Sequence, residues 1–102
     1  MTKSRILVVD DERIVSLDIQ GALARLGYAL AGAASTGEAA LSLVQSAEPD
    51  LVLMDVRLDG GMDGIEAALR ISQAADVPVV FLTAYSDEQT MRRAQAASPF
   101  GY

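Results

Sequence analysis

The chain has 102 residues, and its composition excludes several kinds of protein. It contains neither cysteine nor histidine, which rules out disulfides, thiolate nucleophiles and the commonest transition-metal ligand. The formal net charge of −6 argues against direct binding to nucleic acid, which needs clustered Lys and Arg. The apolar run from Ile6 to Val9 is too short for a signal peptide or a membrane span. We therefore expect one acidic, cytoplasmic α/β domain with no membrane contact.

Strand and helix patterns alternate along the chain. Runs of consecutive apolar residues, such as Leu51 to Met54, predict strands buried on both faces. Between these runs, apolar residues recur at helical spacing, as Val15, Ile19 and Leu23 do. The predicted elements are a strand at 5–9, a helix at 13–26, an edge strand at 29–33, a helix that ends before 49, a strand at 51–55, a helix at 65–75, a strand at 79–82 and a helix at about 87–97.

Several residues between these elements predict where helices begin and end. Gly27 suits the position just after the first helix, where the backbone often turns left-handed. Either Ser35 or Thr36 can cap the second helix, and Pro49 forbids its continuation. For the third helix, the apolar spacing predicts an inner face of Ile65, Ala68, Leu69 and Ser72.

The alternation of strands and helices predicts a parallel sheet with right-handed crossovers and helices on both faces. Four strands are complete, and residues 101–102 look like the beginning of a fifth. In this plan Asp10, Asp11, Asp55 and Thr83 all stand at C-terminal ends of strands. An open parallel sheet binds its ligands at that edge.

A single carboxylate at the end of a buried strand is costly unless it is paired, bound to a metal or in use, which makes Asp55 the first candidate for chemistry. If the Asp10 and Asp55 strands are neighbours, three carboxylates converge, repel one another and raise one another's pKa values. A bound Mg²⁺ would relieve this repulsion. Taken alone, Asp10 and Asp11 could equally be acidic residues at the start of a helix.

Four segments carry a resemblance that covers nearly the whole chain. They are residues 6–12 (ILVVDDE), 51–55 (LVLMD), 62–66 (MDGIE) and 78–84 (PVVFLTA). In this order they resemble the receiver domain of bacterial two-component response regulators. The resemblance implies a flavodoxin-like, doubly wound sheet with strand order 2-1-3-4-5.

The resemblance also implies roles for individual residues. Asp55 would accept a phosphoryl group from a histidine kinase or a phosphotransfer protein. Mg²⁺ would be bound by Asp11, by Asp55 and by the backbone carbonyl of Arg57, with Asp10 acting largely through water. The residues expected to contact the phosphoryl group or to change rotamer on activation are Thr83, Ala84 and Tyr102.

One part of the family pattern is missing from the sequence. Receiver domains carry a lysine at the end of the fifth strand, whereas Lys3 is the only lysine in this chain and precedes the first strand. We therefore expect residues 1–102 to be a C-terminally incomplete receiver domain, with a truncated fifth strand and no last helix. Apolar surface on one sheet face should then be uncovered, and the chain could form a homo-oligomer through it.

Three functions are compatible with these residues. The first is a phosphoacceptor domain that depends on Mg²⁺ and is not a turnover enzyme. The second is a binding or dimerisation module that keeps the receiver fold without its switch. The third is an aspartyl-phosphate phosphatase, which usually needs a second Asp two residues after the nucleophile, where this chain has Arg57.

Overall fold

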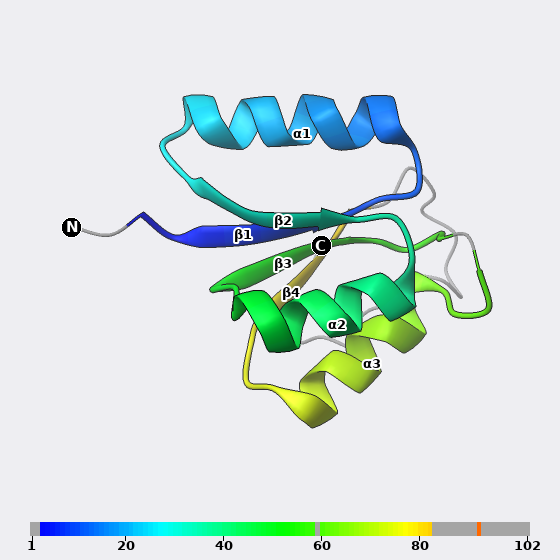
Figure 1. Cartoon of the computed structure of the whole chain (residues 1–102). Helices are drawn as coiled ribbons and strands as arrows, with labels where there is room; N and C mark the ends of the chain where they lie inside the picture. The colour runs from blue at the N-terminus through cyan, green and yellow to red at the C-terminus, as the bar shows by residue number, and fades with distance from the viewer. Residues whose placement is uncertain (1–2, 59, 83–91, 93–102) are drawn as a thin grey trace.

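The computed structural model describes residues 3–58, 60–82 and 92, and its strands and helices alternate as expected (Figure 1). The elements are β1 (Arg5–Val9), α1 (Arg13–Arg25), β2 (Ala29–Ala34), α2 (Gly37–Ala47), β3 (Leu51–Asp55), α3 (Gly64–Ala74) and β4 (Val79–Leu82). Each lies within one or two residues of its predicted bounds. The helix expected at 87–97 and the fifth strand expected at 101–102 lie outside the described residues.

The four strands form one parallel sheet in the order β2-β1-β3-β4. This is the order that the resemblance implied for the first four strands, and β2 stands at an edge as predicted. In the pairing of β1 with β3, Ile6 lies opposite Leu51 and Val9 lies opposite Met54. The residues that follow each strand are therefore neighbours at the C-terminal edge of the sheet.

Helices cover both faces of the sheet, with α1 on one face and α2 and α3 on the other (Figure 1). The main core lies between the sheet and the pair α2 and α3. On this side the strand side chains Leu7, Val52, Met54 and Phe81 are fully or almost fully buried. Burying each of these large side chains stabilises the fold by roughly 1.5–3 kcal/mol.

Among the described residues, the α1 side of the sheet is covered less completely than the other side, in agreement with the expectation that apolar surface on one sheet face is uncovered. Within α1 only Ser16 is buried, and Leu26, which follows the helix, is 75% exposed. The prediction that β3 is buried on both faces is therefore wrong in part: Leu51 and Leu53 are only half-buried. Side chains alternate between the faces of a strand, so these two face the thinly covered side.

The inner face of α3 also differs from the prediction. Ile65 and Ala68 are buried as expected, but Leu69 is 43% exposed and Ser72 is exposed. Ala67 and Ile71 take their places in the core. The small side chain at Ala67 allows close packing on α2, where a Cβ atom at Gly37 would lie 3.2 Å from that of Ala67.

The helix ends follow ordinary capping rules. Thr36, and not Ser35, caps α2: its Oγ1 accepts a hydrogen bond from the backbone N–H of Ala39 at 3.1 Å. Gly27 has the positive φ of 93° that the sequence predicted after α1. At the end of α2 the left-handed residue is Glu48, directly before Pro49. Across the described ranges, no helix has the length and apolar content needed to cross a bilayer.

Candidate functional site

The pairing of β1 with β3 brings two carboxylates together. Val9 and Met54 are register partners, so Asp10, directly after β1, and Asp55, the last residue of β3, lie at neighbouring strand ends. Asp11 comes next in the chain, in the short connection between β1 and α1. The convergence predicted from the sequence is therefore confirmed for these three residues.

The three carboxylates form a compact cluster. One carboxylate oxygen from each of Asp10, Asp11 and Asp55 lies within 4.8 Å of the other two. Asp10 is only 6% exposed, whereas Asp11 and Asp55 are half-buried. Hard divalent cations are bound by oxygen ligands at this spacing. The site is thus deep on the Asp10 side and open on the side of the other two.

Backbone groups orient two of the carboxylates. Asp10 Oδ1 accepts a hydrogen bond from the Glu12 N–H at 2.9 Å. Asp55 Oδ1 accepts a longer one from the Arg57 N–H at 3.3 Å. In addition, the Asp10 N–H donates to the carbonyl oxygen of Ala34 at 3.0 Å, which ties this residue to β2. The side chains are therefore held by the turns that follow each strand.

The environment of Asp55 raises the pKa of its carboxyl group from 3.8 to about 6. Burial is the largest cause, since it disfavours the charged form. The hydrogen bond from the Arg57 N–H lowers the pKa, and the negative charges of Asp10, Asp11 and Glu12 raise it again. The predicted repulsion by Asp10 and Asp11 is therefore confirmed, but burial has the larger effect, and Glu12 adds a contribution that was not predicted.

The start of α3 also shapes the site, a contribution that was not predicted from the sequence. The Gly64 N–H donates to the carbonyl oxygen of Val56 at 2.8 Å. A Cβ atom at Gly64 would overlap the carbonyl oxygen of Asp55. The glycine in the segment 62–66 was the available signal, because glycine often marks a close approach of two backbones.

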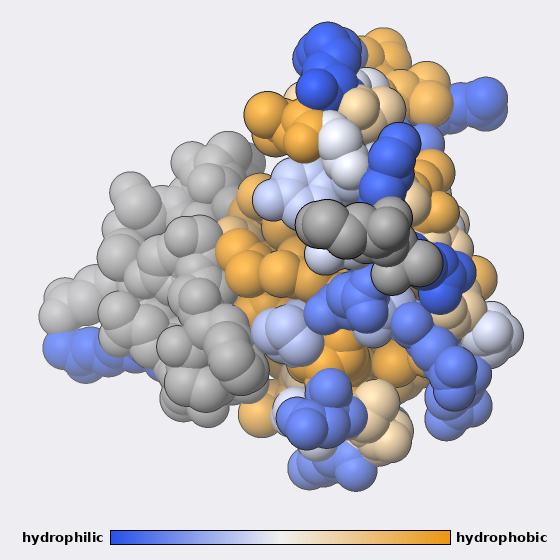
Figure 2. All heavy atoms as spheres, turned by 90° about the vertical axis from the view of Figure 1, so that its left-hand side faces the viewer, coloured by the Kyte–Doolittle hydropathy of each residue, from blue (hydrophilic) through white to orange (hydrophobic). Residues whose placement is uncertain are grey.

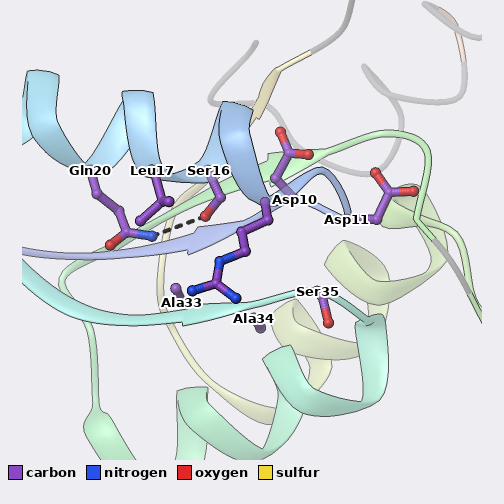
Figure 3. Close-up of a pocket in the computed structure, with 9 residues that line it drawn as sticks. Asp10, Asp11, Ser16, Leu17, Gln20, Ala33, Ala34 and Ser35 are labelled. Atoms are coloured by element: carbon purple, nitrogen blue, oxygen red, sulfur yellow. Dashed lines mark hydrogen bonds between the residues drawn. The ribbon is translucent and has the colours of Figure 1, made fainter.

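A cavity of about 400 Å³ lies beside the cluster, between α1 and the end of β2 (Figure 3). Its small side chains Ala33 and Ala34 leave the space, and a hydrogen bond from Gln20 Nε2 to Ser16 Oγ crosses one side (Figure 3). The lining residues are Asp10, Asp11, Arg13, Ser16, Leu17, Gln20, Ala33, Ala34 and Ser35. Two of the clustered residues, Asp10 and Asp11, thus line an open space whose other walls are largely apolar.

Not every predicted site residue can be placed. Arg57 is exposed and follows Asp55 closely enough for its N–H to reach the carboxylate. The candidates Thr83, Ala84 and Tyr102 lie outside the described residues. The structure therefore brings together the acidic part of the predicted site.

The fold and the acidic cluster define a class of protein: a doubly wound α/β domain with a carboxylate site at the C-terminal edge of its sheet. The family model described as "Response regulator receiver domain" matches residues 6–102. The chain therefore belongs to the response regulator receiver family.

Two proteins of similar sequence are transcriptional regulatory proteins. The transcriptional regulatory protein PdtaR of Mycobacterium tuberculosis is 37% identical over 98 residues, which are 96% of this chain and 47% of PdtaR. The transcriptional regulatory protein YvrH of Bacillus subtilis is 38% identical over 88 residues, 86% of this chain and 37% of YvrH. The chain thus spans half or less of the length of these relatives.

Solved structures agree with the family assignment. The signal receiver domain of a modulated diguanylate cyclase from Desulfovibrio desulfuricans matches with a TM-score of 0.92 and 34% identity, over 99% of this chain and 80% of that one. The receiver domain of the putative response regulator NarL from Mycobacterium tuberculosis matches with a TM-score of 0.90 and 29% identity, over 99% and 82% of the two chains.

Proposed function

We propose that this chain is the phosphoacceptor domain of a two-component signalling system and that Asp55 receives the phosphoryl group. The observation that carries the proposal is the cluster in which carboxylate oxygens of Asp10, Asp11 and Asp55 lie within 4.8 Å of one another. Within this cluster, Asp55 is the member that is itself the last residue of a strand, the interior strand β3, and it lies with Asp11 in the more open part of the site. Membership of the receiver family supports the same assignment.

The donor set fits Mg²⁺. It consists of carboxylates only, two of them half-buried and therefore reachable from solvent. Asp11, Asp55 and the backbone carbonyl of Arg57 would hold the ion, and Asp10 would act largely through water. When bound, Mg²⁺ supplies positive charge that neutralises the oxygens of the transferred phosphoryl group.

The transfer itself needs little from the protein beyond position and charge. A carboxylate oxygen of Asp55 attacks the phosphorus, a new O–P bond forms, and the bond from phosphorus to the donor atom breaks. An ionised carboxylate has no proton to lose, so the absence of histidine from the chain removes nothing that this step requires. The Arg57 N–H holds Oδ1 of Asp55 and so orients the attacking group.

A small phosphodonor tests the proposal directly. Incubation with acetyl phosphate and Mg²⁺ should add one phosphoryl group, detected by intact mass. Reduction of the acyl phosphate followed by peptide mapping should place it on Asp55. Asp55→Asn should remove the label completely. Asp18→Asn, at an exposed position of α1, is the matched control and should be labelled like the wild type. Stable labelling at another residue would overturn the assignment.

The natural donor and the setting follow from the same proposal. The donor would be a histidine kinase or a phosphotransfer protein, and transfer would take place in the cytoplasm. Thr83 and Ala84 would contact the phosphoryl group, and Tyr102 would change rotamer on activation. The chain would accept one phosphoryl group per cycle and would not act as a turnover enzyme. Arg57, in the position where an aspartyl-phosphate phosphatase usually carries Asp, disfavours that enzyme class.

A second candidate function is self-association, which one surface favours. A mostly apolar cavity of about 450 Å³ lies at the end where the strands begin, on the thinly covered side of the sheet. Its lining residues are Ser4, Ile6, Leu23, Tyr28, Asp50, Leu51, Leu53 and Val80. Figure 2 shows this end of the molecule, with hydrophobic side chains gathered in the middle of the face among charged ones.

We propose that a second copy of the chain covers this surface. Sedimentation velocity at several concentrations should then show a dimer, and Leu53→Ser should shift the equilibrium toward monomer. Leu69→Ser changes an exposed leucine on the other side of the sheet and is the matched control. A monomer at every concentration would contradict self-association. Equal dimerisation of phosphorylated and unphosphorylated protein would favour the non-switching module.

A further inference from the structure

Arg13 occupies an unusual position for an arginine. It is the first residue of α1, where the helix dipole disfavours positive charge. Its side chain is exposed and lines the cavity of about 400 Å³ together with Asp10 and Asp11. Among the described residues, the structure gives its guanidinium group no ion pair and no hydrogen bond. Helix stability therefore gives no reason for a cation at this position.

The charges of the site give a reason for a cation at the position of Arg13. Three clustered carboxylates lie where an anionic donor would arrive, and a bound Mg²⁺ would offset only part of their charge, so repulsion would still oppose the approach of the donor. In the described part of the chain, Arg13 is the cation that lines the cavity beside this cluster. A guanidinium group can form two parallel hydrogen bonds to a carboxylate or phosphate, which makes it well suited to an anionic partner.

The cavity can hold a small group with both polar and apolar parts, such as an acyl group with its carboxylate. Its volume of about 400 Å³ is many times the roughly 30 Å³ that one water molecule takes up in the liquid. Ser16 is only 7% exposed, and its Oγ accepts a hydrogen bond from Gln20 Nε2. This pair and the Ser35 hydroxyl add neutral polar groups to the wall that carries Arg13. The space next to the acidic cluster is thus open and mainly apolar, with a few polar groups and one cation in its wall.

We infer that Arg13 contacts the leaving group of an acyl phosphate donor and favours donors whose leaving group is an anion. The inference rests on the proposed phosphoacceptor function of Asp55. In the step concerned, an Asp55 oxygen bonds to phosphorus, the bond from phosphorus to the acyl oxygen breaks, and the electron pair leaves with a carboxylate. That carboxylate would be the partner of the Arg13 guanidinium group, and no proton is transferred.

Two phosphodonors with different leaving groups distinguish contact of Arg13 with the leaving group from a general effect of its positive charge on the site. Acetyl phosphate releases acetate, whereas phosphoramidate, protonated on nitrogen, releases neutral ammonia. At saturating Mg²⁺, Arg13→Gln should slow labelling by acetyl phosphate about five- to tenfold, the effect of losing one charge-assisted contact. The rate of labelling of the same variant by phosphoramidate should differ from that of the wild type by less than about twofold. Arg13→Lys should keep most of the acetyl phosphate rate.

The matched control is Arg25→Gln, which removes the same charge at the other end of α1. It should label at the wild-type rate with both donors. Equal slowing with both donors in Arg13→Gln would overturn the inference and point to a general field effect, and so would an unchanged rate with both. Failure of the wild type to label Asp55 with either donor would instead overturn the proposed function, and this inference with it.

Discussion

Gly64, the first residue of α3, lies directly against the backbone of Asp55, the last residue of β3. A Cβ atom at Gly64 would overlap the carbonyl oxygen of Asp55, and the Gly64 N–H donates to the carbonyl oxygen of Val56 at 2.8 Å. The loop between β3 and α3 therefore closes tightly on the strand end that carries the proposed phosphoacceptor. The position of α3 and the geometry of the acidic site depend on the same contact.

Gly64→Ala should destabilise the domain by about 2–4 kcal/mol, because the added methyl group must displace backbone atoms and no flexible side chain can yield instead. Urea denaturation followed by circular dichroism measures the change. Gly61→Ala, in the same loop, adds a methyl group that meets no atom within 4 Å and should change stability by less than about 0.5 kcal/mol. Equal effects of the two substitutions would contradict the close approach of Gly64 to Asp55.

The raised pKa of Asp55 predicts a pH dependence of stability in the absence of metal. Its carboxyl group titrates at about 6 in the folded chain and at 3.8 ordinarily, so the folded state binds a proton more tightly. The stability that this provides is present below pH 3.8 and is lost as the pH rises through about 6. Asp55→Asn cannot titrate at this position, so its stability should not fall in this way as the pH rises.

The measurement is urea denaturation of wild type and Asp55→Asn in a chelating buffer at pH 4 and pH 8. At pH 8 the free energy of unfolding of the variant should exceed that of the wild type by about 1 kcal/mol, and at pH 4 the two should differ little. The difference at pH 8 is small because solvent screens the charge of a half-exposed group. Asp76→Asn, at an exposed position after α3, should show no such difference. A wild type at least as stable as Asp55→Asn at pH 8 would contradict a raised pKa.

Mg²⁺ should raise the melting temperature of the wild type by several degrees, because an ion that binds only the folded state stabilises it by mass action. The increase should be larger at pH 8 than at pH 5, since protons on Asp55 compete with the ion. Asp11→Asn should abolish the increase, and Asp76→Asn should preserve it. Thermal denaturation with and without Mg²⁺ gives the result. An undiminished increase in Asp11→Asn would place the ion elsewhere.

Thr36→Ala should destabilise the domain by about 1 kcal/mol, because it removes the hydrogen bond from the Ala39 N–H to Thr36 Oγ1 that caps α2. Ser35→Ala, one residue earlier and exposed, should have almost no effect. Urea denaturation distinguishes the two. The opposite ranking would make Ser35 the cap, which was the other possibility from the sequence alone.

The sequence by itself determined the element order and the candidate acidic residues. Four apolar runs separated by helical spacing leave few alternatives to a parallel sheet, and Pro49 and Gly27 end their helices for local reasons. Asp55 could be selected because a carboxylate at the end of a buried strand is costly unless it is paired with another group or binds a ligand. These inferences depend on neighbours in the chain, which a sequence displays directly.

Tertiary structure decided what depends on residues distant in the chain. That Leu69 is exposed while Ile71 is buried follows from the rotation of α3 against α2, which helical spacing alone does not fix. The pKa of Asp55 is raised mainly by burial, a property of the whole packed sheet. Gly64 meets Asp55, and Arg13 lines the same cavity as Asp10 and Asp11, only because strand pairing and helix packing bring these segments together. Packing across the sheet, which sequence spacing does not specify, thus gives the acidic cluster its surroundings.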